Sequence, residues 1–180
     1  MKKINKLLII LISIIALFTV LFELDKGPVI VLKDISIVLT LILPYLFEKV
    51  FKKNLSEGFK LVWIIFIFMA HYLGVICELY NSWTFFDKIV HTISGILTAY
   101  VAMIILDDNK VKKKAFNILF IIAFSALCAL TWEIFEFVCN ILVGGDAQKV
   151  VETGVNDTML DMIVALIGSI LFSIWYKRRT

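Results

Sequence analysis

Ionisable residues recur at helical spacing inside apolar segments of this chain. Three pairs lie three or four positions apart: Asp87 and His91, Glu133 and Glu136, and Asp157 and Asp161. Because residues at these separations share one face of an α-helix, we expect each pair to project together from its helix. Carboxylates and imidazoles presented in this way on facing helices bind metal ions in helical bundles.

The segments that carry these pairs are long and apolar. Hydrophobic residues make up 61% of the 180-residue chain, and its mean hydropathy is +0.97. A helix needs about 20 mostly apolar residues to cross a bilayer, and barrel strands would alternate with period two. We therefore predict an all-α fold, a polytopic transmembrane bundle of six helices in one integral-membrane domain (1–180), with spans at about 7–24, 29–47, 59–79, 87–106, 116–139 and 157–176.

The second of these spans is the weakest. Lys33 and Asp34 interrupt it, and Pro44 lies near its far end. Proline is tolerated in a membrane helix where neighbouring groups bond the carbonyl that it frees.

Basic residues orient the spans. The 18 Lys and Arg residues are divided unequally between the two sides of the predicted bundle. One side has 14 of them, and the other has four: Lys26, Lys33, Lys88 and Lys149. Since basic residues collect on the cytoplasmic side, we predict that both termini are cytoplasmic. The first span lacks the small-x-small site at which a signal peptide is cleaved, so we expect it to remain part of the mature protein. The predicted location is the bacterial cytoplasmic (inner) membrane, crossed several times.

This orientation puts the ionisable pairs at a common depth, in the outer third of the membrane. A charge inside the bilayer costs about 2.5–3.5 kcal/mol on insertion scales and marks a candidate functional site. Helix capping is an alternative reason for Asp87 and Asp157, which begin their spans. Capping does not account for the residues inside the spans: His91, Glu133, Glu136 and Asp161.

Together with Glu78, these groups supply six carboxylates to one region. They cannot all stay ionised in a low-dielectric pocket, so either several are protonated or a cation neutralises them. We predict a divalent metal ion whose ligands are His91, Glu133, Glu136 and Asp161, with Asp87 and Asp157 orienting them and Lys88 at the rim. Glu133, Glu136 and Asp161 are also the catalytic candidates, and Zn, Mn, Fe and Mg all remain open.

The other histidine and two of the cysteines are expected to have structural roles. His71 is deep and isolated in the third span and is expected to be a hydrogen-bonded core histidine. Cys77 and Cys139 both fall near outer helix ends, which leaves open whether they pair or stay as free thiols.

The ordered motifs resemble a known group of proteins. Asp87-Lys88-x-x-His91-x-x-Ser94-Gly95, then Glu133-x-x-Glu136, then Asp157-Thr158-x-x-Asp161 with Gly168 are similar to the YjdF-like bacterial membrane proteins. That family has no assigned biochemical function. The motifs are more distantly similar to VanZ-like proteins, which are linked to glycopeptide resistance. Glu136 and Ala165 stand where VanZ-like proteins have Gln and Asn.

Three classes of function fit these observations. The first is an outward-facing metal site acting on an envelope lipid or lipid-linked substrate, the second an ion- or proton-coupled transporter. The third is a non-enzymatic scaffold or resistance protein whose polar core only fixes helix packing. The bilayer is the expected partner, and a net charge of +3 is too small to indicate nucleic acid. Oligomeric state, and whether the protein is an enzyme, are left open.

Overall fold

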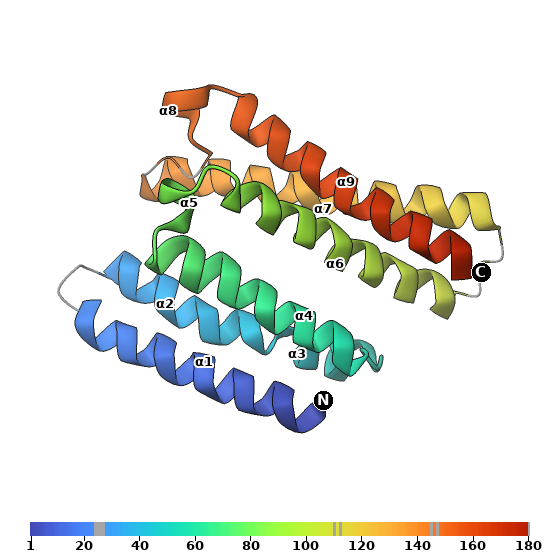
Figure 1. Cartoon of the computed structure of the whole chain (residues 1–180), viewed down its shortest axis with the longest axis horizontal. Coiled ribbons are helices and arrows are strands. Elements are labelled where there is room, and N and C mark those ends of the chain that lie inside the picture. The colour runs from blue at the N-terminus through green and yellow to red at the C-terminus, as the bar shows by residue number, and fades with distance from the viewer. Residues whose placement is uncertain (24–27, 110, 112, 145, 147, 180) are drawn as a thin grey trace. The chain divides into compact units, whose positions relative to one another are not determined.

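The computed structural model describes residues 1–23, 28–109, 111, 113–144, 146 and 148–179, and every regular element in those residues is a helix. Contacts divide the chain into two compact units, residues 1–83 and 84–180, whose helices are labelled in Figure 1. The all-α prediction is confirmed. Within the described residues, five helices are long and apolar enough to cross a membrane: Lys2–Phe22, Glu57–Ile76, Phe86–Asp107, Lys114–Leu142 and Asn156–Arg178. That the whole chain is one domain stays a prediction.

The first unit packs its long helices around an aliphatic core. Its elements are α1 (Lys2–Glu23), α2 (Pro28–Leu41), α3 (Leu43–Phe51), α4 (Glu57–Ile67), the π-helix η2 (Phe68–Ile76) and α5 (Leu79–Ser82). Side chains from α1, α2 and α4 are buried against one another there: Ile12, Ala16, Ile37, Leu41, Ile64 and Ile67.

The second predicted span is divided into two helices. It breaks at Ile42, between α2 and α3, and Pro44 lies in the first turn of α3. Proline has no N–H and its ring clashes with the carbonyl four residues earlier, here that of Thr40. The indole Nε1 of Trp63 donates to the Thr40 oxygen at 2.9 Å. A neighbouring helix therefore bonds the freed carbonyl, while α2 alone, at 14 residues, is too short to span.

The third predicted span changes its winding halfway. It is α-helical to Ile67 and continues as a π-helix, which the sequence analysis did not foresee. The ring of Tyr80 packs on Gly74, where a Cβ atom would lie 2.2 Å from Tyr80 Cε2. His71 is half-buried in this π-helix, and its imidazole makes no hydrogen bond to the residues that the structure describes, so the expected side-chain bond is not found.

The second unit is a bundle of three long helices. They are α6 (Phe86–Asp108), α7 (Lys114–Val143) and α9 (Asn156–Arg179), with the short α8 (Val150–Thr153) between the last two. In Figure 1 the beginnings of α6 and α9 lie at the same end of this unit as the end of α7, and the C-terminus lies at the other. At that other end an apolar cluster includes Ala99, Ala102, Leu106, Ile121 and Phe172.

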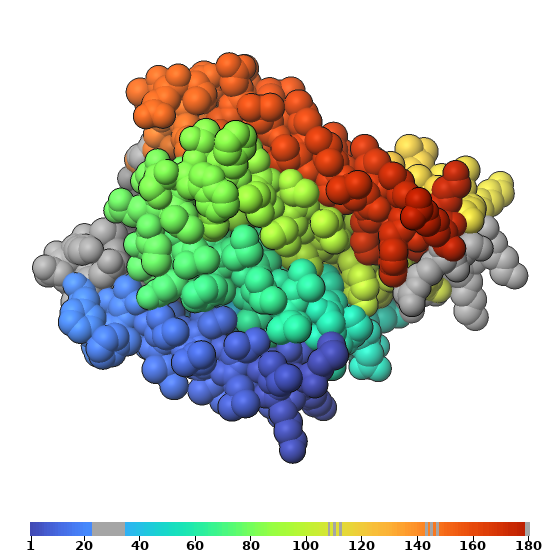
Figure 2. All heavy atoms as spheres, viewed as in Figure 1, coloured from blue at the N-terminus to red at the C-terminus, as the bar shows by residue number. Residues whose placement is uncertain are grey.

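Two glycines allow α6 and α9 to touch through their backbones. A Cβ atom on Gly95 would lie 1.9 Å from the carbonyl oxygen of Ala165, and one on Gly168 would lie 2.2 Å from that of Thr92. Small residues permit such approaches between membrane helices. In the space-filling view, atoms of α6 and α9 lie directly against one another (Figure 2). The contact fixes α9 against α6 one to two turns from the ionisable residues.

Candidate functional site

The ionisable residues gather where the three helices of the second unit meet at one end. Asp87, Lys88 and His91 lie in the first two turns of α6, and Asp157 and Asp161 in the first two turns of α9. Glu133 lies toward the end of the antiparallel α7. Asp87 does not cap α6, because the N-cap residue is Phe85, whose side chain makes no capping bond. The predicted meeting of these three helices is therefore found, whereas Glu78, the sixth carboxylate counted from the sequence, belongs to the first unit.

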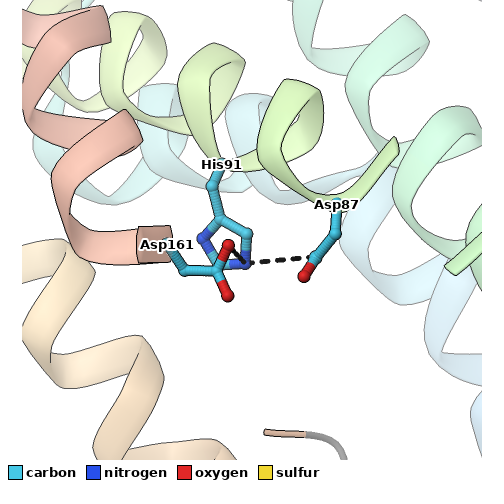
Figure 3. A group of neighbouring side chains, drawn as sticks. All are labelled: Asp87, His91 and Asp161. Atoms are coloured by element: carbon cyan, nitrogen blue, oxygen red, sulfur yellow. Dashed lines mark ion pairs between the residues drawn. The ribbon is translucent and has the colours of Figure 1, made fainter. Parts of the chain in front are cut away.

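Three of these side chains face one another closely enough to share an ion. One ligand atom each from Asp87, His91 and Asp161 lies within 4.8 Å of the others. His91 Nε2 is 3.5 Å from Asp87 Oδ1 and 3.8 Å from Asp161 Oδ1, along the dashed lines of Figure 3. Ligand atoms about 2.1 Å from a tetrahedral zinc ion lie about 3.4 Å apart, close to these distances. The group could hold a metal ion.

Lys88 lies among the carboxylates rather than at their rim. Its Nζ is 2.5 Å from Asp157 Oδ1, 2.7 Å from Asp161 Oδ1 and 3.3 Å from Asp87 Oδ2. Lys88 was predicted to lie at the rim of the pocket, and the structure corrects this prediction. Lys88 is an intrachain cation that neutralises part of the acidic cluster, so the carboxylates are not without a positive partner.

The loop between α7 and α9 covers this end of the bundle with two further polar residues. Gln148 is buried and its Nε2 donates to the backbone oxygen of Glu133 at 3.1 Å and to Glu133 Oε2 at 3.4 Å. Lys149 Nζ is 3.9 Å from Asp87 Oδ2. The sequence analysis assigned neither residue to the site. The one available signal was that Lys149 is a rare basic residue on the predicted outer side.

The remaining predicted site residues occupy different surroundings. Glu133 is buried and interacts electrostatically with His91, but it is not part of the three-residue group. Glu136 is half-buried, and its Oε1 accepts a hydrogen bond from Trp132 Nε1 on the same helix at 2.7 Å. Asp157 contacts Lys88. Asp87, predicted to orient the ligands, instead offers an atom to the group directly. That Glu133 and Glu136 are ligands stays a prediction.

Two other residues of the sequence analysis belong to the first unit. Glu78 is exposed, with a φ of 56° before α5. Cys77 is also exposed, and Cys77, Cys128 and Cys139 are all free thiols in the structure, so Cys77 and Cys139 are not paired in it.

A shallow, mostly apolar hollow adjoins the cluster on α6. It has a volume of about 250 Å³ and is lined by Phe85, Lys88, Ile89, Thr92 and Ile93. These residues are three or four positions apart and therefore share one face of the helix. The Thr92 hydroxyl donates to the carbonyl of Lys88 at 2.7 Å. Lys88 is the charged residue among those that line the hollow, and its ammonium contacts the aspartates.

Sequence comparisons connect the chain with other membrane proteins. It is 30% identical over 145 residues to a Thermotoga maritima protein named only as uncharacterized, a match that covers 76% of this chain and 71% of that protein. No solved structure matches. Residues 5–180 match the family described as predicted membrane protein (DUF2238). Because that match includes nearly every residue, with the whole Asp/His/Lys cluster among them, the chain belongs to the DUF2238 family of membrane proteins.

Proposed function

We propose that this protein is a multi-pass protein of the bacterial cytoplasmic membrane that binds a divalent metal ion through Asp87, His91 and Asp161. The observation that carries this proposal is the spacing of their three ligand atoms, all within 4.8 Å of one another. Both His91 and Asp161 are at least nine-tenths buried, and His91 makes no hydrogen bond through its ring to the described residues. A buried imidazole aimed at two carboxylates at ligand distances is suited to a metal rather than to packing alone.

Formal charge supports the same proposal. The carboxylates of Asp87, Asp157, Asp161 and Glu133 meet two ammonium groups, those of Lys88 and Lys149. Two negative charges remain when all are ionised and His91 is neutral. Since buried charges are tolerated only when paired, this excess of negative charge favours the binding of a divalent cation.

We propose that the site faces outward and acts on an envelope lipid or lipid-linked substrate. Three protein ligands leave a coordination position for water or a substrate oxygen, which a metal would activate or polarise. Glu133, beside His91, is the candidate general base. The alternation of basic residues supports an outward site and cytoplasmic termini. We also propose that the YjdF-like proteins, whose motifs this chain resembles, belong to the same family as this chain.

A transporter is less well supported, because the described residues of the bundle offer no continuous polar route past the site. Thr98 bonds Ser125, but Ser169 and Ser173 donate to backbone carbonyls of their own helix. Beyond them lies a mostly apolar cluster of described residues without a carboxylate, an imidazole or an ammonium group, formed by Ala99, Ala102, Leu106, Ile121, Phe172 and Tyr176. The Tyr176 hydroxyl accepts a hydrogen bond from Asn117 Nδ2 at 3.1 Å.

Replacing His91 should abolish metal binding. We expect the wild-type protein, purified without chelator, to carry close to one divalent ion per chain, and His91→Ala to lose it because one of three ligands is gone. The measurement is elemental analysis of both proteins. His71→Ala is the matched control, since the chain has two histidines and this one lies in the other unit. A folded wild-type protein with no metal, before or after incubation with Zn²⁺ or Mn²⁺, would support the structural-scaffold alternative.

The proposed orientation predicts that Cys77 is accessible from outside the cell. Cys77 is exposed at the end of η2, on the predicted outer side, whereas Cys128 and Cys139 are half-buried. A membrane-impermeant maleimide added to intact cells should label the wild-type protein and leave Cys77→Ser largely unlabelled. Labelling of Cys77 only after the cells are opened would mean that the protein has the opposite orientation in the membrane.

A further inference from the structure

Lys88 is part of both the acidic cluster and the neighbouring hollow. Its ammonium contacts three aspartates of the cluster, and its side chain lines the hollow on α6. We propose that Lys88 exchanges between these places: a divalent cation that binds at Asp87, His91 and Asp161 releases Lys88 into the hollow, where it binds the phosphate of an anionic phospholipid. This inference rests on the proposed metal site and adds the substrate class.

The exchange follows from aspartates that face both Lys88 and His91. Asp161 Oδ1 is 2.7 Å from Lys88 Nζ and is also the atom that faces His91 Nε2 at 3.8 Å. Asp87 faces Lys88 through Oδ2 and His91 through Oδ1. A metal bound between His91 and the two aspartates would withdraw electron density from the oxygens that hold the ammonium, and two cations so close together repel each other. Metal binding therefore weakens the hold on Lys88.

The hollow suits a phospholipid. Four of its lining residues, Phe85, Ile89, Thr92 and Ile93, present a mostly apolar surface to an acyl chain. The N-cap residue of α6 is Phe85, whose side chain cannot accept from the first-turn N–H groups, so the positive end of a 23-residue helix lies beside Lys88. A released ammonium and a helix N-terminus are together complementary to one phosphate. Lysine is long and flexible enough to move between the two positions.

Thermodynamic linkage makes the exchange measurable. If the metal frees Lys88 for the lipid, then the lipid must tighten metal binding by the same factor. For coupling of ordinary size we expect phosphatidylglycerol to lower the Kd of Mn²⁺ by about tenfold in the wild-type protein. In Lys88→Met the competing ammonium is gone, so Mn²⁺ should bind more tightly in neutral lipid and phosphatidylglycerol should add nothing specific.

The experiment is a Mn²⁺ titration, followed by electron paramagnetic resonance of the free ion, in detergent micelles that contain either phosphatidylcholine or phosphatidylglycerol. Lys149→Met is the matched control: it also removes an ammonium near Asp87, but Lys149 does not line the hollow. Its Mn²⁺ binding should tighten while its tenfold lipid response persists. Ile93→Trp fills the hollow without touching the aspartates and should abolish the response alone, which provides a second test if Lys88→Met does not fold.

The possible results separate the two proposals. Equal lipid responses in wild type, Lys88→Met and Ile93→Trp would reflect only surface attraction of Mn²⁺ and would overturn the exchange, while the metal site would stand. Added inorganic phosphate that reproduced the response would likewise overturn a lipid occupant. Absence of Mn²⁺ binding in every variant and lipid would overturn the metal site itself.

Discussion

Gly95→Ala should destabilise the second unit strongly. The new methyl group would lie 1.9 Å from the carbonyl oxygen of Ala165, and the obstacle is backbone rather than a movable side chain. Alanine is intrinsically a better helix former than glycine by about 1 kcal/mol. Overpacking of a tight contact costs about 1–3 kcal/mol and more where the neighbour cannot move. We expect the steric cost to dominate, with a net loss of about 2 kcal/mol or more.

The measurement is the free energy of unfolding in mixed detergent micelles, together with metal content. Separation of α6 from α9 moves Asp161 away from Asp87 and His91, so metal binding should fall in parallel. Gly58→Ala is the control, because its Cβ would meet nothing closer than Met1 Cε at 3.7 Å. If Gly95→Ala were as stable as Gly58→Ala, the close approach of the two helices would be wrong.

The helices themselves were predictable, because length and apolarity decide them. The predicted spans at 87–106, 116–139 and 157–176 differ from α6, α7 and α9 by a few residues at each end. Once those helices exist, the i,i+4 pairs Asp87–His91 and Asp157–Asp161 must share faces, and connectivity brings their ends together. The shared depth of the acidic residues was therefore available from the sequence.

The position of Lys88 was not predictable in the same way. A lysine at a helix end can extend to the water interface or fold back, and the choice depends on partners from another helix. Those partners, Asp157 and Asp161, lie about 70 positions away in the chain. Gln148 and Lys149 lie in an irregular loop without hydrophobic periodicity, so nothing local directs them toward Glu133 and Asp87.

Glu136 and the π-helix show opposite limits. Trp132 and Glu136 are four positions apart, so their hydrogen bond could have been predicted from helical spacing. The π-helix over Phe68–Ile76 has an apolar sequence without a local signal for wider winding. It depends on packing, such as that of the Tyr80 ring on Gly74, which only the folded unit shows.

Lys88→Met should be unstable in the presence of a chelator and regain stability with a divalent cation. Removing one partner of a buried ion pair costs about 3–5 kcal/mol because the other charges stay buried without compensation. Here one ammonium serves three aspartates. A cation at about 100 times its Kd stabilises the state that binds it by about 2.7 kcal/mol, so most of the loss should be recovered.

Lys60→Met distinguishes a metal site from any acidic pocket. Lys60 is also buried, and oxygens of Glu48 and Glu57 both lie 2.9 Å from its Nζ. Among the described residues, no histidine lies with these two carboxylates in a group spaced to hold a metal ion. Loss of the Lys60 ammonium should likewise destabilise the protein. The measurement is the free energy of unfolding of each variant, once in the presence of EDTA and once in the presence of Mn²⁺. Mn²⁺ should restore Lys88→Met and leave Lys60→Met unstable, because carboxylates alone do not supply the His91 imidazole. Equal rescue of both variants would mean that Mn²⁺ merely screens acidic residues, and His91 would then have no special role.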